Sequence, residues 1–187
     1  SSGNVGIGVT NPSSKLEVYT NTDVSAIIGR AHIGNIGWGN CAGLSHVDFN
    51  TTTNYGFLQC DDGTTYINAP TNTSVRFRIN NSDKMYLKTD GNVGIGTTSP
   101  VSLLHIYENS TNTASTSGLT IQNAGAGDAI CQYLAGSVRW VTGIDNSDSD
   151  KFKIASSYDL NTDARLTIDT SGKVGIGTIS PTEKLEV

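Results

Sequence analysis

One ten-residue motif occurs three times in this chain of 187 residues. Its copies begin at Gly3, Gly91 and Gly172, and the second copy has the sequence Gly-Asn-Val-Gly-Ile-Gly-Thr-Thr-Ser-Pro. Each copy runs on into a short tail in which a polar residue stands between two apolar ones, as at residues 104–106. Three near-identical segments in one short chain indicate a repeat architecture, in which each repeat is one structural unit.

The spacing of the three motifs divides the chain into modules. We predict a first module at residues 1–90, a second at residues 91–171 and the start of a third at residues 172–187. The first and last residues both fall inside the repeat unit. We therefore expect this chain to be a segment of a longer protein.

Alternating apolar and polar residues precede the second and third motifs. The alternation covers residues 75–79 and 84–87 before the second motif, and residues 151–154 and 165–168 before the third. Apolar side chains would lie on one face of each segment and basic or polar side chains on the other, which is typical of strands. Further short strands are predicted in the first half of each module, for example at residues 118–121.

The composition also favours strands and turns over helices. Only 36% of the residues are hydrophobic and 16% are charged, and Gly, Asn, Thr and Ser fill the difference. A helical domain would carry more Leu, Ala, Glu and Lys, and no segment of useful length has the helical period of 3.6 residues. We predict an all-β fold, with at most one helical turn after each motif proline.

The motif itself alternates between branched apolar residues and glycine. If it is a strand, Val93 and Ile95 face one way while Gly94 and Gly96 face the other. A glycine inside a strand costs about 0.5–1 kcal/mol relative to alanine, so its recurrence suggests that something approaches this face closely. The simplest candidate is another chain.

A small hydrophobe-poor module has little core of its own and is marginal as an isolated domain. Assembly of several chains would supply the missing burial. We therefore predict a repetitive, intertwined homotrimeric β-fibre, built as a triple β-helix, as β-prism-like modules or as small sandwiches in series. The predicted structural residues at the trimer axis are Val5, Ile7, Val93, Ile95, Val174 and Ile176, with Gly94 and Gly96 allowing the chains to approach.

The segments 138–140, 143–148, 151–154 and 165–169, together with the motif at 172–181, resemble the repeats of phage and virus tail-fibre proteins. The resemblance covers nearly all of the second module and the last third of the first. It implies a homotrimeric fibre shaft at a virion surface, with other fibre segments or virion proteins as partners. Such shafts often precede a self-cleaving chaperone domain, but its catalytic residues have no counterpart here, so we expect no enzymatic activity.

Three functions follow from this resemblance and from the residue types. The first is a structural segment that projects a receptor-binding tip toward a host. The second is an adhesin module that binds host-surface glycans through loops such as 34–40 or 145–150, and the third is part of a polysaccharide-degrading spike. Aromatic rings stack on sugar rings, which makes four residues candidate ligand-binding residues: Trp38, Tyr55, Trp140 and Tyr158. For Trp38 and Trp140, packing in the core is the favoured interpretation.

Several other classes of function are disfavoured. The net charge of −5 lacks the basic character of a nucleic-acid-binding protein, and no apolar run reaches the length of about 18 residues that suggests membrane insertion. The motif glycines have the spacing G-x-x-G-x-G rather than that of a dinucleotide-binding loop, so we predict no cofactor. Residues 145–150 are rich in oxygen ligands but lack the glycine and terminal glutamate of a calcium loop, and we expect a polar turn and no metal site.

The cysteines and histidines give no site pattern. The three cysteines, Cys41, Cys60 and Cys131, match no metal-binding spacing. Buried thiols are the favoured interpretation, and a disulfide between Cys41 and Cys60 stays open. His105 takes the place that a glutamate has in the other two motif tails, which predicts a surface position without a catalytic role.

Overall fold

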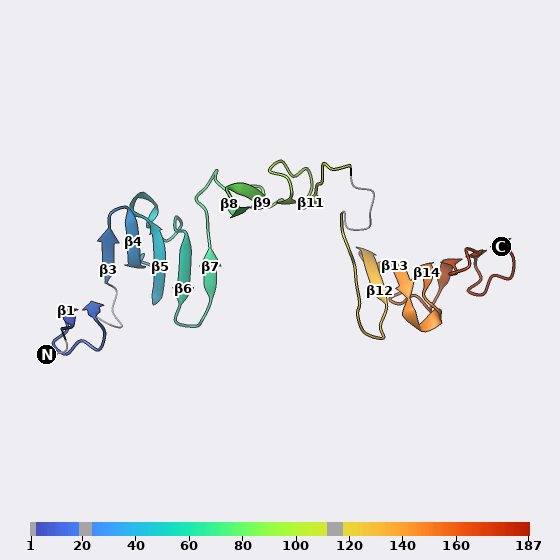
Figure 1. Ribbon diagram of the computed structural model, residues 1–187, viewed down its shortest axis with the longest axis horizontal. Coiled ribbons are helices and arrows are strands. Elements are labelled where there is room, and N and C mark those ends of the chain that lie inside the picture. The colour runs from blue at the N-terminus through green and yellow to red at the C-terminus, as the bar shows by residue number, and fades with distance from the viewer. Residues whose placement is uncertain (1–2, 19–23, 112–117) are drawn as a thin grey trace. The chain divides into compact units, whose positions relative to one another are not determined.

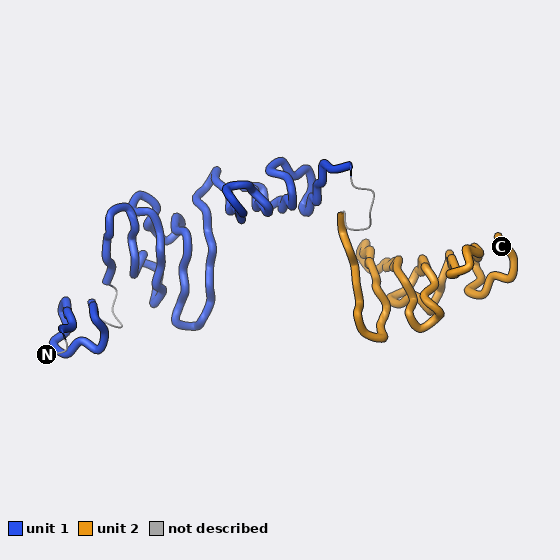
Figure 2. The backbone as a smooth tube through the Cα atoms, in the orientation of Figure 1, with its two compact units in different colours: residues 1–113 blue, residues 114–187 orange. Residues whose placement is uncertain are grey.

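The computed structural model describes residues 3–18, 24–111 and 118–187, in which the regular elements are β-strands and two short 3-10 helices (Figure 1). No α-helix occurs among these residues, which confirms the predicted all-β fold, and no helix there has the length and apolar character needed to cross a membrane. The chain divides into two compact units, residues 1–113 and 114–187 (Figure 2).

The first unit begins with a two-stranded sheet, followed by a five-stranded antiparallel sheet in which each strand pairs with the next along the chain. The two-stranded sheet contains β1 (Val5–Ile7) and β2 (Leu16–Val18). The five-stranded sheet contains β3 (Ser25–Ile28), β4 (Ala31–Asn35), β5 (Cys41–His46), β6 (Phe57–Cys60) and β7 (Thr65–Ile67), with the 3-10 helix η1 (Val47–Phe49) after β5.

A four-stranded sheet completes the first unit. Its strands are β8 (Val75–Ile79), β9 (Ser82–Leu87), β10 (Val93–Ile95) and β11 (Leu104–Ile106). The predicted strands at 75–79 and 84–87 are confirmed, but the segment between them is shorter than the expected loop at 80–83. Asn80 and Asn81 both have positive φ, 49° and 59°, which is the conformation of a tight two-residue hairpin turn.

The second unit contains one six-stranded sheet. Its strands are β12 (Ala129–Ala135), β13 (Val138–Asp145), β14 (Lys151–Ala155), β15 (Ala164–Ile168), β16 (Val174–Ile176) and β17 (Leu185–Glu186), with the 3-10 helix η2 (Asn146–Asp148) after β13. The predicted strands at 151–154 and 165–168 are confirmed. The predicted strand at 118–121 is wrong, because this segment pairs with no strand and β12 is the outermost strand of the sheet.

All three motifs form the same structure. The motif strand pairs in parallel with its own tail, so that Val93 lies opposite Leu104 and Ile95 opposite Ile106, and the first and third copies have the same register. The connection at residues 96–103 is shorter than the dozen or so residues that a parallel crossover usually takes. Backbone hydrogen bonds hold both of its ends, for example from Val93 N to the Leu103 carbonyl at 2.8 Å.

The second and third motifs join the sheets of the strands that precede them. β10 pairs antiparallel with β9, and β16 pairs antiparallel with β15. The compact units divide at residues 113 and 114, while the module boundaries at 90/91 and 171/172 rest on the sequence repeat and stay predictions.

The five-stranded and six-stranded sheets each have a small core on one of their two faces. In the five-stranded sheet the core consists of Ile36, Cys41, Tyr55 and Leu58. In the six-stranded sheet it consists of Val141, Ala155 and Leu160, with Ile130 packed against it. Both cores recruit residues from loops, so each of these sheets is covered by its own connections on a single face.

Candidate functional site: the uncovered sheet faces

The first glycine inside the motif strand is explained within the chain. A Cβ added to Gly94 would overlap the carbonyl oxygen of Thr97, because the connection after β10 folds back against the strand. Gly6 and Gly175 meet the equivalent carbonyl in the other copies. The expected approach of a second chain is therefore not needed to account for this glycine.

The second glycine is required for its backbone conformation, which the alternation of side chains does not reveal. Gly96 lies beyond the end of β10 and has φ of +75°, a left-handed conformation that residues with side chains rarely adopt. Gly177 has φ of +76° at the same place in the third motif. These glycines let the chain leave the strand sharply and begin the short connection.

The four-stranded sheet has one largely apolar face, which we call an uncovered face because most of its apolar side chains are exposed. Two rows of cross-strand neighbours run over it. They are Val75–Leu87–Val93–Leu104 and Phe77–Met85–Ile95–Ile106. Phe77 is 47% exposed and Leu104 57%. The opposite face carries polar residues, including Arg76, whose guanidinium lies 5.1 Å from the centre of the Tyr86 ring.

The six-stranded sheet has an uncovered face of the same kind. One row of cross-strand neighbours is Ile144–Phe152–Ile168–Val174–Leu185, and a second is Thr142–Ile154–Leu166–Ile176. Tyr133 and Trp140 extend this face as directly opposed residues of β12 and β13. The other face is the covered one, where Val141 and Thr167 are fully buried.

The five-stranded sheet repeats the arrangement. Ile33, Leu44, Phe57 and Ile67 form one cross-strand row and are all exposed, while Leu58 on the other face is fully buried in the core. None of the side chains in the rows of the three sheets is charged. Contiguous exposed apolar surface is a feature that interaction sites commonly have.

The six predicted axis residues all lie on apolar strand faces together with their cross-strand neighbours. Val5 and Ile7 are both 56% exposed, Ile95 and Ile176 are exposed, and the remaining two are partly buried. The structure thus brings each Val–Ile pair together with the apolar residues of its tail. That these residues meet those of other chains around an axis stays a prediction.

The predicted ligand-binding aromatics divide between different environments. Trp38 is 40% exposed and stacks on Tyr66 with ring centres 5.3 Å apart, and it meets Tyr55 edge-on at 6.0 Å. Tyr55 itself is buried in the core, and this burial, with a smaller effect of Tyr66, raises the pKa of its hydroxyl. Tyr66, the stacking partner of Trp38, was not among the predicted ligand-binding residues.

The other two predicted aromatics lie in the second unit and are not brought together with the first pair. Trp140 belongs to the uncovered face of the six-stranded sheet, beside Tyr133. Tyr158 is 68% exposed in the segment between β14 and β15. Trp140 is thus 40% exposed among the apolar side chains of this face, and Tyr158 is exposed outside the strands, so sugar binding by either residue stays a prediction.

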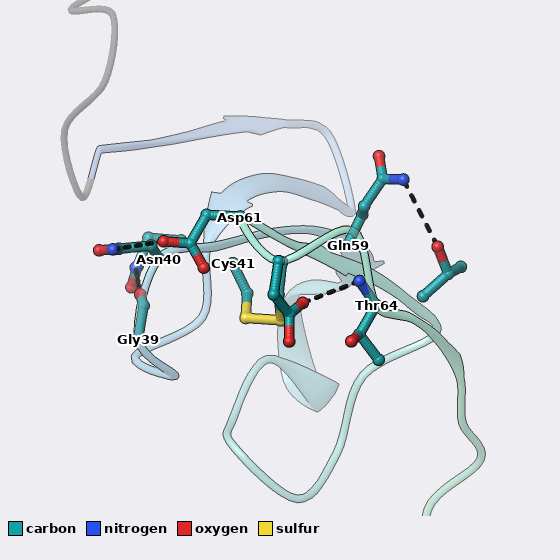
Figure 3. The surroundings of a disulfide bond; sticks show 10 residues. Gly39, Asn40, Cys41, Gln59, Asp61 and Thr64 are labelled. Atoms are coloured by element: carbon teal, nitrogen blue, oxygen red, sulfur yellow. Dashed lines mark hydrogen bonds between the residues drawn. A yellow bond between two sulfur atoms is a disulfide. The ribbon is translucent and has the colours of Figure 1, made fainter.

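Cys41 and Cys60 form a disulfide, so the favoured interpretation of buried thiols is wrong for this pair (Figure 3). They lie directly opposite each other on β5 and β6. The adjoining residues add a hydrogen bond from Asn40 to Asp61 of 2.8 Å. Cys131 is a free thiol on the uncovered face of the six-stranded sheet.

Two of the three aspartates in the oxygen-rich segment at 145–150 form ion pairs with lysines. The Lys153 ammonium lies 2.7 Å from Asp145 and 2.6 Å from Asp148, and Lys151 lies 2.8 Å from Asp148. The side chains of Lys153 and Asp145 are both 0% exposed. The described residues contain no group of three or more His, Cys, Asp or Glu side chains able to hold a metal ion.

Ion pairing decides the charge states in this cluster. Burial alone would raise the pKa of Asp145, but hydrogen bonds from Lys153 and Ser147 outweigh it and hold this pKa below its ordinary value. Burial would likewise lower the pKa of Lys153, but its hydrogen bonds to Asp145 and Asp148 raise it. Alternation placed Lys153 on the polar face of its strand but could not show that this face is buried.

Comparison with known proteins gives one partial relationship. No family model matches the chain. It is 38% identical over 99 residues to a protein described as "Uncharacterized protein VP1" from Micromonas pusilla reovirus (isolate Netherlands/2005). The match covers 48% of this chain and 5% of that protein, so about half of this chain is similar to a small part of a much longer viral protein.

Proposed function

We propose that this chain is a structural segment of a trimeric viral tail or surface fibre, which holds a receptor-binding tip away from the virion. The observation that carries the proposal is the uncovered apolar face present on each of the three larger sheets. A single chain with two small cores leaves these faces in water. Identical chains packed face to face would bury them.

The chemistry of the faces favours copies of this chain as the partner. Their cross-strand rows contain aliphatic, aromatic and neutral residues without a charge that a different partner would have to match. Obligate interfaces between identical subunits have this composition, because they resemble a domain core cut in half. We propose three chains because the repeats resemble those of trimeric tail-fibre shafts. The viral relative supports a viral origin.

Light scattering on the purified chain, over a series of concentrations, tests the proposal. We expect a single species with three times the chain mass of 19.7 kDa. A stably folded monomer would contradict the proposal. An open distribution of masses would replace the closed trimer with a head-to-tail filament.

A matched pair of substitutions identifies the interface. Phe152→Asp places a charge on the uncovered face of the six-stranded sheet, and we expect it to abolish the trimer. Tyr158→Asp makes a comparable change at an exposed aromatic residue outside the strands, and we expect the trimer to persist. Equal behaviour of the two variants would rule out this face as the interface.

A second candidate function is glycan binding by the same segment. The exposed stacked rings of Trp38 and Tyr66 favour it, because they belong to the core side of the five-stranded sheet and would stay accessible when the uncovered face is occupied. Chemical-shift changes in the trimer on titration with neutral oligosaccharides would test this function. Trp38→Ala should remove those changes without altering the molar mass.

A further inference from the structure

The cluster around Lys153 is unusual because its central charges are fully removed from solvent. Lys153 on β14 and Asp145 at the end of β13 are both 0% exposed, with Nζ and Oδ2 2.7 Å apart. A second carboxylate, that of Asp148, places its Oδ2 2.6 Å from the same Nζ. Burying such charges carries a desolvation cost that pairing repays only in part.

We propose that Lys153 and Asp145 join in an intramolecular isopeptide bond, an amide between the lysine side-chain nitrogen and the aspartate Cγ. The bond would link β13 to β14 covalently inside one chain. It does not depend on the proposed fibre function or on any partner chain, because every group involved belongs to the second unit.

The carbonyl that would be attacked is already polarised. Oδ1 of Asp145 accepts hydrogen bonds from the Ser147 hydroxyl at 2.8 Å and from the backbone N–H of Asp148 at 3.1 Å. Negative charge develops on this oxygen when an amine adds to Cγ. Two fixed donors at such an oxygen are the arrangement by which acyl-transfer sites stabilise the tetrahedral intermediate.

Asp148 is placed to move the protons. Its Oδ2 takes a proton from the Lys153 ammonium, which frees the nitrogen lone pair to form the Nζ–Cγ bond. The same carboxyl then delivers that proton to Oδ2 of Asp145. A second proton passes from Nζ to Oδ2 as the Cγ–Oδ2 bond breaks. Water thus leaves with two of the three ammonium protons and the third stays on the amide nitrogen, so atoms and charge balance without any oxidant or co-reactant. Lys151, 2.8 Å from Oδ1 of Asp148, holds this carboxylate in position.

The surroundings favour the amide over the ion pair. Condensation replaces two buried charges with one neutral group, which removes the desolvation penalty of both. Leu160, Val141 and Ala155 form the fully buried core of this same sheet face. The full burial of Lys153 and Asp145 also limits access of the water that hydrolysis of the amide would need.

Intact-mass measurement of the purified wild-type chain tests the proposal, after reduction of the disulfide between Cys41 and Cys60. We expect a mass lower than that of the sequence by one water molecule. Trypsin should fail to cleave after Lys153 and should leave its peptide joined to the one that contains Asp145. The full sequence mass in the wild-type chain would overturn the proposal.

Two variants make the result specific. Lys153→Met keeps an unbranched side chain without a nucleophile, and Asp148→Asn removes the proton acceptor while keeping the shape; both should have the full sequence mass, with folding checked by circular dichroism. Loss of water in Lys153→Met as well would place the reaction elsewhere, for example at Asp62-Gly63, and overturn the proposal. Loss of ammonia from the wild-type chain would point instead to Asn161, whose Oδ1 lies 3.3 Å from Nζ, and would also overturn it.

Discussion

The carbonyl oxygen of Thr97 occupies the space that a Cβ on Gly94 would need. This relationship explains why the motif is so constant among its three copies. The short connection between parallel strands folds back over its own strand, and a residue with a side chain at position 94 would push it away. The repeated glycine is thus required by the local fold, before any contact between chains is considered.

Gly94→Ala should destabilise the chain by about 1–3 kcal/mol, because the added methyl group must displace backbone. Thermal unfolding of the variant measures the effect. Gly125→Ala is the matched control, since its Cβ would meet only a side-chain oxygen at 3.4 Å. A Gly94→Ala variant with unchanged unfolding temperature and a changed molar mass would restore the explanation by a neighbouring chain.

Reduction of the Cys41–Cys60 disulfide should lower the free energy of unfolding by about 2–4 kcal/mol, because the bond closes a loop between residues 19 positions apart. Denaturant unfolding with and without a reducing agent measures the difference. In Cys131→Ser the effect of the reducing agent should be the same as in the wild-type chain. If reduction has no effect on unfolding, the pair does not stabilise the five-stranded sheet.

Acid should loosen the first and third motif connections. The pKa of Glu17 is lowered chiefly by a hydrogen bond from the Ser13 backbone N–H, and that of Glu186 by the equivalent bond from Thr182. A depressed folded pKa means that the stabilisation is present above the pH range in which the unfolded glutamate titrates. It is lost as the pH falls through the folded pKa.

Amide chemical shifts of Ser13 and Thr182, followed by NMR during an acid titration, measure this loss. Both amides should move as their glutamate partner is protonated. In Glu186→Gln the side chain still accepts a hydrogen bond but has no charge to lose, so Thr182 should become insensitive to this pH range while Ser13 still responds. Titration of Thr182 in that variant would show that another group is responsible.

The two tryptophans should differ in their effect on assembly. Trp140→Ser should weaken the trimer about thirtyfold, because truncation of an interface tryptophan typically costs about 2 kcal/mol. Trp38→Ser should leave the trimer unchanged, since Trp38 packs on Tyr55 and Tyr66 at the core side of its sheet. Sedimentation at several concentrations gives both association constants. Equal weakening would contradict the assignment of Trp140 to the interface.

Alternation along the chain was enough to predict the strands before the second and third motifs and the shared face of Val93 and Ile95, because both depend only on neighbouring residues. The parallel pairing of Val93 with Leu104 was not predictable in this way, since it depends on the path of the connection between them. The same limit applies to the opposition of Cys41 and Cys60, which follows from the register of β5 and β6.

Lys153 shows a different limit of sequence patterns. Alternation correctly placed it on the face opposite Phe152 and Ile154. It could not show that this face is buried in a core completed by Leu160, or that Asp145 and Asp148 would meet the lysine there. Which face of a sheet becomes buried depends on loops that carry no period of their own.

In the four-stranded and six-stranded sheets, the strand at one edge is the motif's own tail, which pairs in parallel with the motif strand. A duplicated module would therefore bring all of its pairing partners with it, and its loss would leave no strand of the remaining modules without a neighbour. Length could then change in whole modules during evolution without any new contact being selected. In the proposed fibre, the number of motif copies would then set the number of modules and thereby the length.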